Sequence, residues 1–238
     1  MKHATVVENE KIGENYRRLT FEGQALTGVD WVPGQKVQIA MGEGFVTRTY
    51  TPVEWDAKAG RAAIVGYAHG GGPGSAWLRD VQPGNECDIL GPRASINTRA
   101  ISEPLVLFGD ETSIGLAGAI VRQDRDRFCQ CHFEVDDRTS AEDVLTGLGI
   151  AGAALFKRTA SDHHLGEMEA ALAALAKTPA SFVLTGKAGT IQRFRQTLRR
   201  HGVPARRVIT KACWAPGRLD LTDRFNDLPL PAGTACRW

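Results

Sequence analysis

One segment carries residues that could grip a ligand with a phosphate at one end and a flat ring elsewhere. It runs from Arg48 to Pro52 and reads RTYTP. Strand alternation puts Arg48 and Tyr50 on one face, and Thr49 and Thr51 on the other. A guanidinium pairs with phosphate oxygens, and an aromatic ring packs on a heterocycle. On this segment alone, an edge strand with a solvated Arg and a half-buried Tyr is the safer interpretation.

A glycine-rich segment, GGGPGSAWL at residues 70–78, opens a short predicted helix. Bare N–H groups and the positive end of a helix dipole form a seat for pyrophosphate. Ser75 is the predicted N-cap, and its hydroxyl could also serve an anion. The spacing allows this loop and Arg48 to reach one ligand, and His69 is the histidine placed to contact it. A plain capped turn is the alternative.

Three later turns follow predicted strands. The first, FGDETSIG at 108–115, lacks GxGxxG, so the standard dinucleotide fingerprint is absent. Thr112 and Ser113 can cap a helix and donate to a phosphate, whereas Asp110 and Glu111 would repel one unless they turn away. The others read LTGKAG at 184–189 and KACWAPGR at 211–218, and neither is a P-loop. The last turn could be structural only.

The predicted elements that must position these residues differ between the two halves of the chain. Short alternating runs broken by turn residues predict an antiparallel barrel or sandwich, with strands near 4–7, 16–21, 36–41, 45–51, 62–68 and 86–90 and a helix at 74–80. Beyond residue 103, strands alternate with helices, which predicts a parallel sheet covered on both faces. We therefore expect domains at 1–100 and 101–238, with a ligand between them at the carboxyl ends of the parallel strands.

The composition narrows the class of protein. Lys+Arg 29 against Asp+Glu 27 gives a formal net charge of +2, which argues against a dedicated nucleic-acid binder. The longest uncharged stretch, 144–156, is too short to span a bilayer, and the polar N-terminus has no signal-peptide pattern. Five cysteines without a CxxC pair predict free thiols and no metal site. We expect a cytoplasmic protein without a membrane partner.

Taken in order, these segments resemble the siderophore-interacting proteins, which are FAD-containing members of the ferredoxin–NADP reductase superfamily. The matching segments read RTYTPV, AHGGGPGSAW, PGNECDILGPR, FGDETSIG, FVLTGKAGTIQ and KACWAPGR. They cover nearly the whole chain, and their order and spacing carry the resemblance. It implies an N-terminal antiparallel FAD-binding β-barrel followed by a C-terminal parallel-sheet α/β domain that binds NAD(P)H.

The resemblance also implies site residues. Thr51 would lie near the reactive edge of the flavin, and Asp110 and Glu111 in the nicotinamide cleft, and these three form the expected catalytic set. The implied cofactor-binding residues are Arg48, Tyr50, Thr51, Gly74, Ser75, Ala76, Trp77, Thr112 and Trp214. Thr49, within the same strand, and His69, beside the glycine-rich loop, join this set by their position in the sequence. Basic residues at the cleft mouth would bind an anionic substrate, namely Lys187, Lys211 and Arg218.

Two positions need separate mention. Many relatives carry a second Arg where this chain has Val53, which implies a looser or differently arranged grip on the flavin. The terminal Trp238 is similar to the C-terminal aromatic that covers the flavin in plant-type relatives, although a disordered tail is an equal alternative.

The activity implied by the resemblance is reduction of a ferric siderophore, or another Fe(III) chelate, by NADH or NADPH through FAD. Fe(II) binds hard oxygen chelators far less tightly than Fe(III), so reduction frees the metal for iron acquisition. The flavin supplies this chemistry, which fits the absence of a Ser-His-Asp pattern. The alternatives are a general flavin or ferredoxin reductase, with ferredoxin as its partner, and a flavin-loaded binding protein without nicotinamide-dependent turnover.

The choice of nicotinamide donor depends on residues after the second and third strands of the α/β half. Glu134, Asp136 and Asp137 would suit ribose hydroxyls and repel a 2′-phosphate. Lys157 and Arg158, after the next strand, would do the reverse. These residues favour NADH slightly over NADPH.

Overall fold

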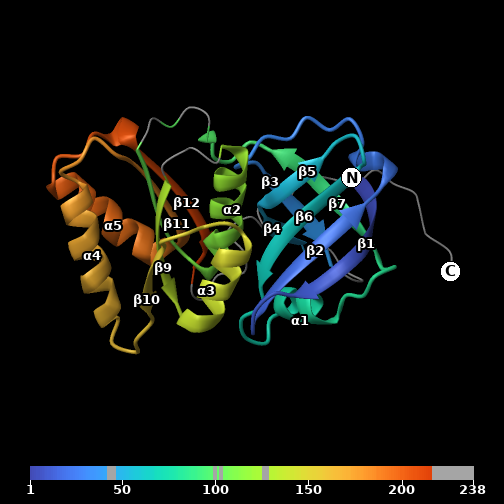
Figure 1. The fold of residues 1–238 in the computed structure, drawn as a ribbon, viewed down its shortest axis with the longest axis horizontal. Helices are drawn as coiled ribbons and strands as arrows, with labels where there is room; N and C mark the ends of the chain where they lie inside the picture. The colour runs from blue at the N-terminus through green and yellow to red at the C-terminus, as the bar shows by residue number, and fades with distance from the viewer. Residues whose placement is uncertain (42–46, 99–100, 102–103, 125–128, 216–238) are drawn as a thin grey trace, which may run out of the picture.

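The N-terminal half is one antiparallel sheet that curls on itself. The computed structural model describes residues 1–41, 47–98, 101, 104–124 and 129–215. The sheet contains β1 (Lys2–Lys11), β2 (Tyr16–Glu22), β3 (Lys36–Ala40), β4 (Thr47–Tyr50), β5 (Pro52–Asp56), β6 (Arg61–Tyr67) and β7 (Glu86–Arg93). The strand order is β4-β3-β7-β1-β2-β6-β5. Because only Thr51 separates the two outermost strands, the edges of the sheet must meet there, which makes it a barrel (Figure 1).

The barrel contains one strand that the sequence did not predict. Strand β5 begins at Pro52, and within the described ranges its one pairing partner is β6. Proline lacks a backbone N–H donor, so in a sheet it is tolerated mainly at the start of a strand or on an edge strand. In the sequence, Pro52 looked like the end of the preceding strand and not the start of a new one. The short helix α1 (Pro73–Asp80) packs against the barrel at the end near β6, as predicted for residues 74–80.

The C-terminal half is a three-layer α/β domain. Its parallel sheet has the order β10-β9-β8-β11-β12, formed by β8 (Leu105–Asp110), β9 (Cys129–Val135), β10 (Ala154–Lys157), β11 (Ser181–Lys187) and β12 (Val208–Trp214). In Figure 1, α2 (Ile114–Gln123) and α3 (Arg138–Gly147) lie between this sheet and the barrel, and α4 (His163–Leu175) and α5 (Ala188–Arg200) cover the far face. The predicted fold class is confirmed.

The order of the strands shows where a ligand would bind. The chain passes from β8 to β9 on one side, and β11 lies on the other side of β8. This is a topological switch point, and open α/β sheets bind ligands outside the carboxyl ends of the strands at such points.

Helix α2 joins the two halves into one core. Val53 and Val65 of the barrel belong to the same buried cluster as Ile114 and Ile120 of α2. A Cβ on Gly115 would lie 3.4 Å from the backbone carbonyl oxygens of Thr51 and Val65. The start of α2 is therefore held directly against the barrel beside Thr51.

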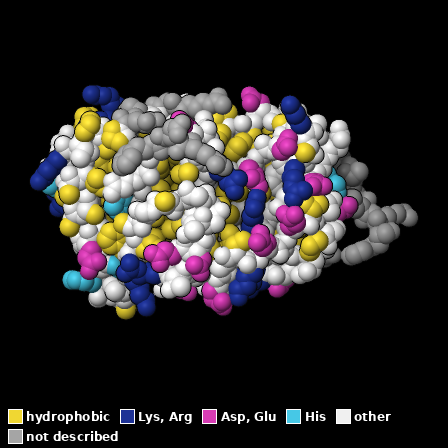
Figure 2. Space-filling view, viewed as in Figure 1, with side chains coloured by type: hydrophobic (Ala, Val, Ile, Leu, Met, Phe, Trp, Pro, Cys, Tyr) yellow, Lys and Arg dark blue, Asp and Glu magenta, His cyan; other side chains and the backbone are white. Residues whose placement is uncertain are grey.

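Charged side chains of both signs are interspersed over the barrel face in Figure 2. Arg61 donates to Glu8 at 3.0 Å and to Glu22 at 2.7 Å, and Glu54 pairs with Arg18 and Arg122. Exposed pairs of this kind contribute little to stability individually. In the described part of the chain, no helix is long and apolar enough to cross a bilayer.

Candidate functional site

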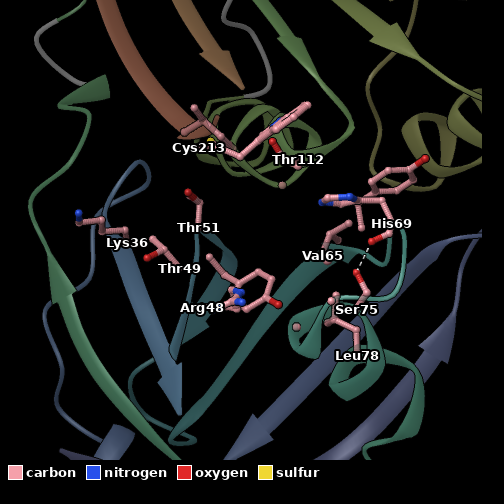
Figure 3. A pocket seen from close by; sticks show the side chains of 18 of the residues that line it. Lys36, Arg48, Thr49, Thr51, Val65, His69, Ser75, Leu78, Thr112 and Cys213 are labelled. Carbon is pink, nitrogen blue, oxygen red and sulfur yellow. Dashed lines mark hydrogen bonds between the residues drawn. The ribbon is translucent and has the colours of Figure 1, made fainter. Parts of the chain in front are cut away.

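A cavity of about 580 Å³ lies where the barrel, the start of α1 and the carboxyl ends of β8 and β12 meet. Figure 3 shows Thr112 and Cys213 of the α/β domain on one side, facing Thr51 and Arg48 of the barrel. The predicted residues that line it are Arg48, Thr49, Tyr50, Thr51, His69, Gly74, Ser75, Thr112, Lys211 and Trp214. The structure thus brings together residues that lie more than 160 positions apart.

The charges of this cavity favour an anionic ligand. Its charged lining residues are Lys36, Arg48 and Lys211, and no Asp or Glu occurs among the described residues that line it. A cavity with charge of one sign and low-dielectric walls focuses the field on an approaching ligand. We therefore expect phosphates or other anions to bind here.

Arg48 and the start of α1 form the phosphate-binding end of the cavity. Strand β4 pairs with β3 so that Arg48 lies opposite Ile39, and its side chain reaches over Gly74. A Cβ on Gly74 would lie 2.9 Å from Cγ of Arg48, too close for an ordinary contact. Glycine at this position lets a guanidinium lie across the positive end of the helix, and both attract a phosphate.

Ser75 has a different role from the one predicted. The N-cap of α1 is Gly72, with Pro73 at the first helical position, so the expectation that Ser75 is the N-cap is wrong. The Ser75 hydroxyl instead donates to the carbonyl oxygen of His69 at 2.5 Å (Figure 3). This bond ties the start of the glycine-rich loop, at His69, to the helix that follows it.

Thr51 connects the two domains at the centre of the cavity. Nζ of Lys211, from β12, donates to Oγ1 of Thr51 at 3.2 Å. Because Thr51 accepts this bond, its own hydroxyl proton is available to a ligand. Burial, together with the nearby Lys36, lowers the pKa of Lys211.

The carboxylate of Asp110 turns away from the cavity. It accepts hydrogen bonds from Thr112 N at 2.9 Å, Thr112 Oγ1 at 2.5 Å and Trp214 Nε1 at 2.8 Å. The side chain is buried, and burial raises the pKa of Asp110. It does not line the cavity, so the prediction of a catalytic Asp110 receives no support from its position.

Glu111 is also occupied away from the cavity. Its carboxylate pairs with both terminal nitrogens of Arg158, at 3.0 and 2.9 Å, and accepts from the backbone of Asp136 at 2.7 Å. Burial alone would lower the pKa of Arg158, but its hydrogen bonds to Glu111 and Asp136 raise it, so the guanidinium stays charged. A buried bidentate pair is a structural contact, and Glu111 has no free oxygen aimed at a ligand.

Acidic residues that were expected to bind a ribose are engaged elsewhere. Glu134 is buried and contacts His164 Nε2 at 3.0 Å and Thr190 Oγ1 at 3.1 Å. Asp137 accepts from Ser140 N at 3.2 Å and caps α3. The buried Glu134 carboxylate is therefore unavailable to a nucleotide, whereas Asp137 stays exposed, so the slight preference for NADH loses the part of its basis that depends on Glu134. Asp136 is exposed, but its carboxylate pairs with Arg158 at 2.6 Å and accepts from the Tyr67 hydroxyl at 3.3 Å.

Besides Asp110 and Glu111, three predicted residues do not line the cavity, namely Ala76, Trp77 and Lys187, and a fourth, Arg218, lies outside the described residues. Ala76 is absent from its walls, and Trp77 packs on the barrel core. Lys187 lies behind the wall, with Nζ 5.9 Å from the centre of the Trp214 ring. Arg218, like Trp238, falls outside the described residues.

Several lining residues were not predicted, and they depend on strand pairing rather than on a motif. Lys36 enters at the start of β3, and Tyr67 ends β6. Cys213 is the extra residue of a bulge in β12, because Gly186 pairs with Ala212 and Lys187 pairs with Trp214. A bulge re-aims side chains, which explains why residues 211–215 all line the cavity in spite of strand alternation.

The cavity fits FAD. Its volume lies in the usual range for small-molecule sites, and it offers an anion-binding end and three aromatic side chains, Tyr50, Tyr67 and Trp214. A Cβ on Gly70, Gly71 or Gly72 would meet no atom within 4 Å, so these residues border open space. Arg48 and the start of α1 would hold the pyrophosphate.

Comparison with known proteins supports this interpretation. Residues 35–96 match the family model of the siderophore-interacting FAD-binding domain. This segment contains the predicted RTYT and glycine-rich elements, so the resemblance seen in the sequence is confirmed there. No curated protein matches the chain.

Solved structures share the fold over both domains. A siderophore utilization protein from T. fusca is 22% identical, with a TM-score of 0.70 over 92% of this chain and 94% of that one. The siderophore-interacting protein of Acinetobacter baumannii is 18% identical, with a TM-score of 0.74 over 91% of each chain. A cytochrome P450 reductase from Amycolatopsis is 16% identical, with a TM-score of 0.66 over 90% of this chain and 70% of that one.

Proposed function

We propose that this chain is an FAD-dependent NAD(P)H oxidoreductase that reduces ferric siderophores or other Fe(III) chelates and thereby releases Fe(II). The observation that carries the proposal is the cavity itself, which joins a phosphate-binding barrel edge to the carboxyl ends of a parallel sheet. The match of residues 35–96 to a siderophore-interacting FAD-binding domain supports the choice of cofactor.

Each group of residues has a distinct task in this proposal. Arg48 and the start of α1 bind the phosphates of the cofactor, because both present positive charge to one end of the cavity. Thr51, held by Lys211, offers its hydroxyl at the domain boundary. Bound FAD would accept two electrons together and release them singly, which a hydride donor and a one-electron acceptor require.

The substrate side of the proposal depends on charge. A ferric catecholate is anionic, and Lys36 and Lys211 line the cavity without a described carboxylate to neutralise them. They would steer such a chelate toward the reduced site. For each NAD(P)H oxidised to NAD(P)⁺, two Fe(III) become Fe(II) and one proton is released, so electrons and charge balance.

The proposal is tested by adding NADH, and separately NADPH, to the FAD-loaded protein without oxygen. The flavin absorbance should bleach with at least one donor and return when a ferric catecholate is added, with two Fe(II) trapped per donor. Bleaching that only a ferredoxin reverses would establish the alternative electron-transfer reductase. Absorbance that neither donor bleaches would leave a flavin-binding protein and refute the proposal.

A further inference from the structure

The indole of Trp214 is fixed in the cavity wall by one hydrogen bond. Its Nε1–H donates to Oδ2 of Asp110 at 2.8 Å. Trp214 ends β12 and lines the cavity, whereas Asp110 ends β8 and lies behind the wall. The bond therefore links two strands that are separated by β11 in the sheet.

The carboxylate of Asp110 is itself held in place. The short 3₁₀ turn Glu111–Ser113 folds the two donors of Thr112 onto Oδ1, which leaves Oδ2 for Trp214. Asp110 is 1% exposed and does not line the cavity, so its carboxylate makes no direct contact with a ligand there. A hydrogen bond to a buried charged group contributes more than one between neutral groups.

The neighbouring strand is shaped to accept this contact. Gly186 in β11 has a φ of +98°, and a Cβ there would overlap the Asp110 carboxyl group. One position further, the bulge at Cys213 brings Trp214 into register with Lys187. Two local irregularities, a left-handed glycine and a bulge, thus coincide at the Asp110–Trp214 bond.

The fixed indole also lies against the other domain. Its ring centre is 6.1 Å from that of His69, and the His69 ring is 5.8 Å from Tyr67, both of which come from the barrel side. On the α/β side, Nζ of Lys187 lies over the indole. The ring therefore belongs to an aromatic layer that crosses the domain boundary at the cavity.

We propose that Asp110 is a positioning residue that fixes the Trp214 indole as the contact surface for a planar heteroaromatic ring bound in the cavity. This inference rests on the proposed function, in which the ring is that of the flavin or of the nicotinamide. Asp110 acts only through Trp214, in place of the direct catalytic role that the resemblance implied for the GDET turn. The Trp214 indole raises the affinity for this ligand because its ring packs against the planar ring of the ligand.

A double-mutant cycle tests the inference. The variants are Asp110→Asn, Trp214→Phe and the double substitution, and the readouts are the Kd for FAD and the visible circular dichroism of bound flavin. Trp214→Phe should weaken binding of the planar ring about tenfold. Asp110→Asn should weaken it about as much alone, but less than twofold when Trp214 is already Phe, because nothing remains to be positioned.

Two arms identify which ring is involved. FAD is titrated into the cofactor-free protein, and NAD⁺ is titrated into the FAD-loaded protein. A coupled loss of FAD affinity assigns the contact to the flavin, and a coupled loss of NAD⁺ affinity alone assigns it to the nicotinamide. If Asp110→Asn changes the Kd for FAD and the Kd for NAD⁺ as much beside Trp214→Phe as in the wild-type protein, the inference is overturned.

Control variants keep the result interpretable. Trp55→Phe also removes an indole hydrogen bond, from Nε1 to the Leu26 carbonyl at 3.2 Å, but lies outside the cavity and should leave both affinities unchanged. A substitute for Asp110→Asn is Ser113→Ala, which removes a hydroxyl that donates to Oδ1 of Asp110 at 3.4 Å and accepts from the Asp110 N–H at 3.3 Å, without changing charge. If Asp110→Asn fails to fold, Ser113→Ala takes its place, with an expected weakening of about threefold that vanishes beside Trp214→Phe.

The outcomes separate this inference from the proposed function. Wild-type protein that binds no FAD would refute the proposed function, and the inference would fall with it. Wild-type protein that binds FAD, with effects of the two substitutions that simply add, would refute the inference and leave the proposed function standing.

Discussion

The imidazole of His132 should make this protein sensitive to acid. The ring lies between two phenylalanines, parallel to Phe108 at 4.3 Å between centres and 6.2 Å from Phe156. Neither ring nitrogen has a hydrogen-bond partner among the residues that the structure describes. Burial without a partner disfavours the charged form and lowers the pKa of His132 to about 4.

The size of the effect follows from the difference in proton uptake. Well above pH 6.5 the ring is neutral in both the folded and the unfolded chain, so it causes no pH dependence there. Between pH 6.5 and 4 the unfolded chain binds a proton that the folded chain does not, so stability falls as pH falls. The free energy of unfolding should lose about 2 kcal/mol from this group between pH 8 and pH 5.

Urea unfolding of wild-type protein and His132→Phe at pH 8 and pH 5 measures this contribution. The variant should lose about 2 kcal/mol less than wild type on acidification, because every other titrating group is shared. It should also be no less stable at pH 8, since two unpaired nitrogens are removed. His201→Gln, at an exposed position, is the matched control and should behave as wild type. An identical pH dependence in wild type and His132→Phe would refute the reasoning.

Further predictions concern the buried charges and the cavity. Gly186→Ala should destabilise the fold by more than about 2 kcal/mol in urea unfolding, whereas Gly202→Ala, also at positive φ but beside open space, should cost only about 1 kcal/mol. Arg158→Gln leaves the Glu111 carboxylate buried without its ion pair and should cost about 3–5 kcal/mol, visible as a lowered Tm; an unchanged Tm would contradict the assigned contact. Lys211→Met should raise the KM for a ferric catecholate several-fold and weaken its dependence on salt, and an unchanged salt dependence would remove Lys211 from substrate steering.

The layout of the fold could be predicted from the sequence because its periodicities are local. Period-two runs predicted the barrel strands, and the alternation of strands with helices predicted the parallel sheet. Strand β5 was missed because Pro52 and the charged residues after it do not alternate like a half-buried strand. The closure of the barrel at Thr51 depends on strand order, which no local pattern contains.

The sequence predicted the part of the candidate site that local motifs form. It did not predict the part that depends on the direction in which a side chain points. Arg48 lies against Gly74, as their spacing suggested. This contact was predictable because the strand at Arg48 and the glycine-rich turn at Gly74 are both set by local sequence. The direction of Asp110 could not be predicted, since it depends on an indole donor 104 positions away. Glu111 likewise faces Arg158, which follows another strand. Carboxylates in a ligand-edge turn look catalytic in a sequence until their partners are known.

We expect the cavity between the two domains to bind FAD, and a titration of FAD into wild type and two matched glycine variants tests this directly. Gly74→Val places a side chain against Arg48 in the phosphate-binding end of the cavity. Gly166→Val makes the same substitution inside helix α4, at a position where a Cβ meets no atom within 4 Å. Wild type and Gly166→Val should bind one FAD per chain with similar Kd, and Gly74→Val should bind at least tenfold more weakly. Equal binding by all three proteins, or no binding by wild type, would contradict the claim.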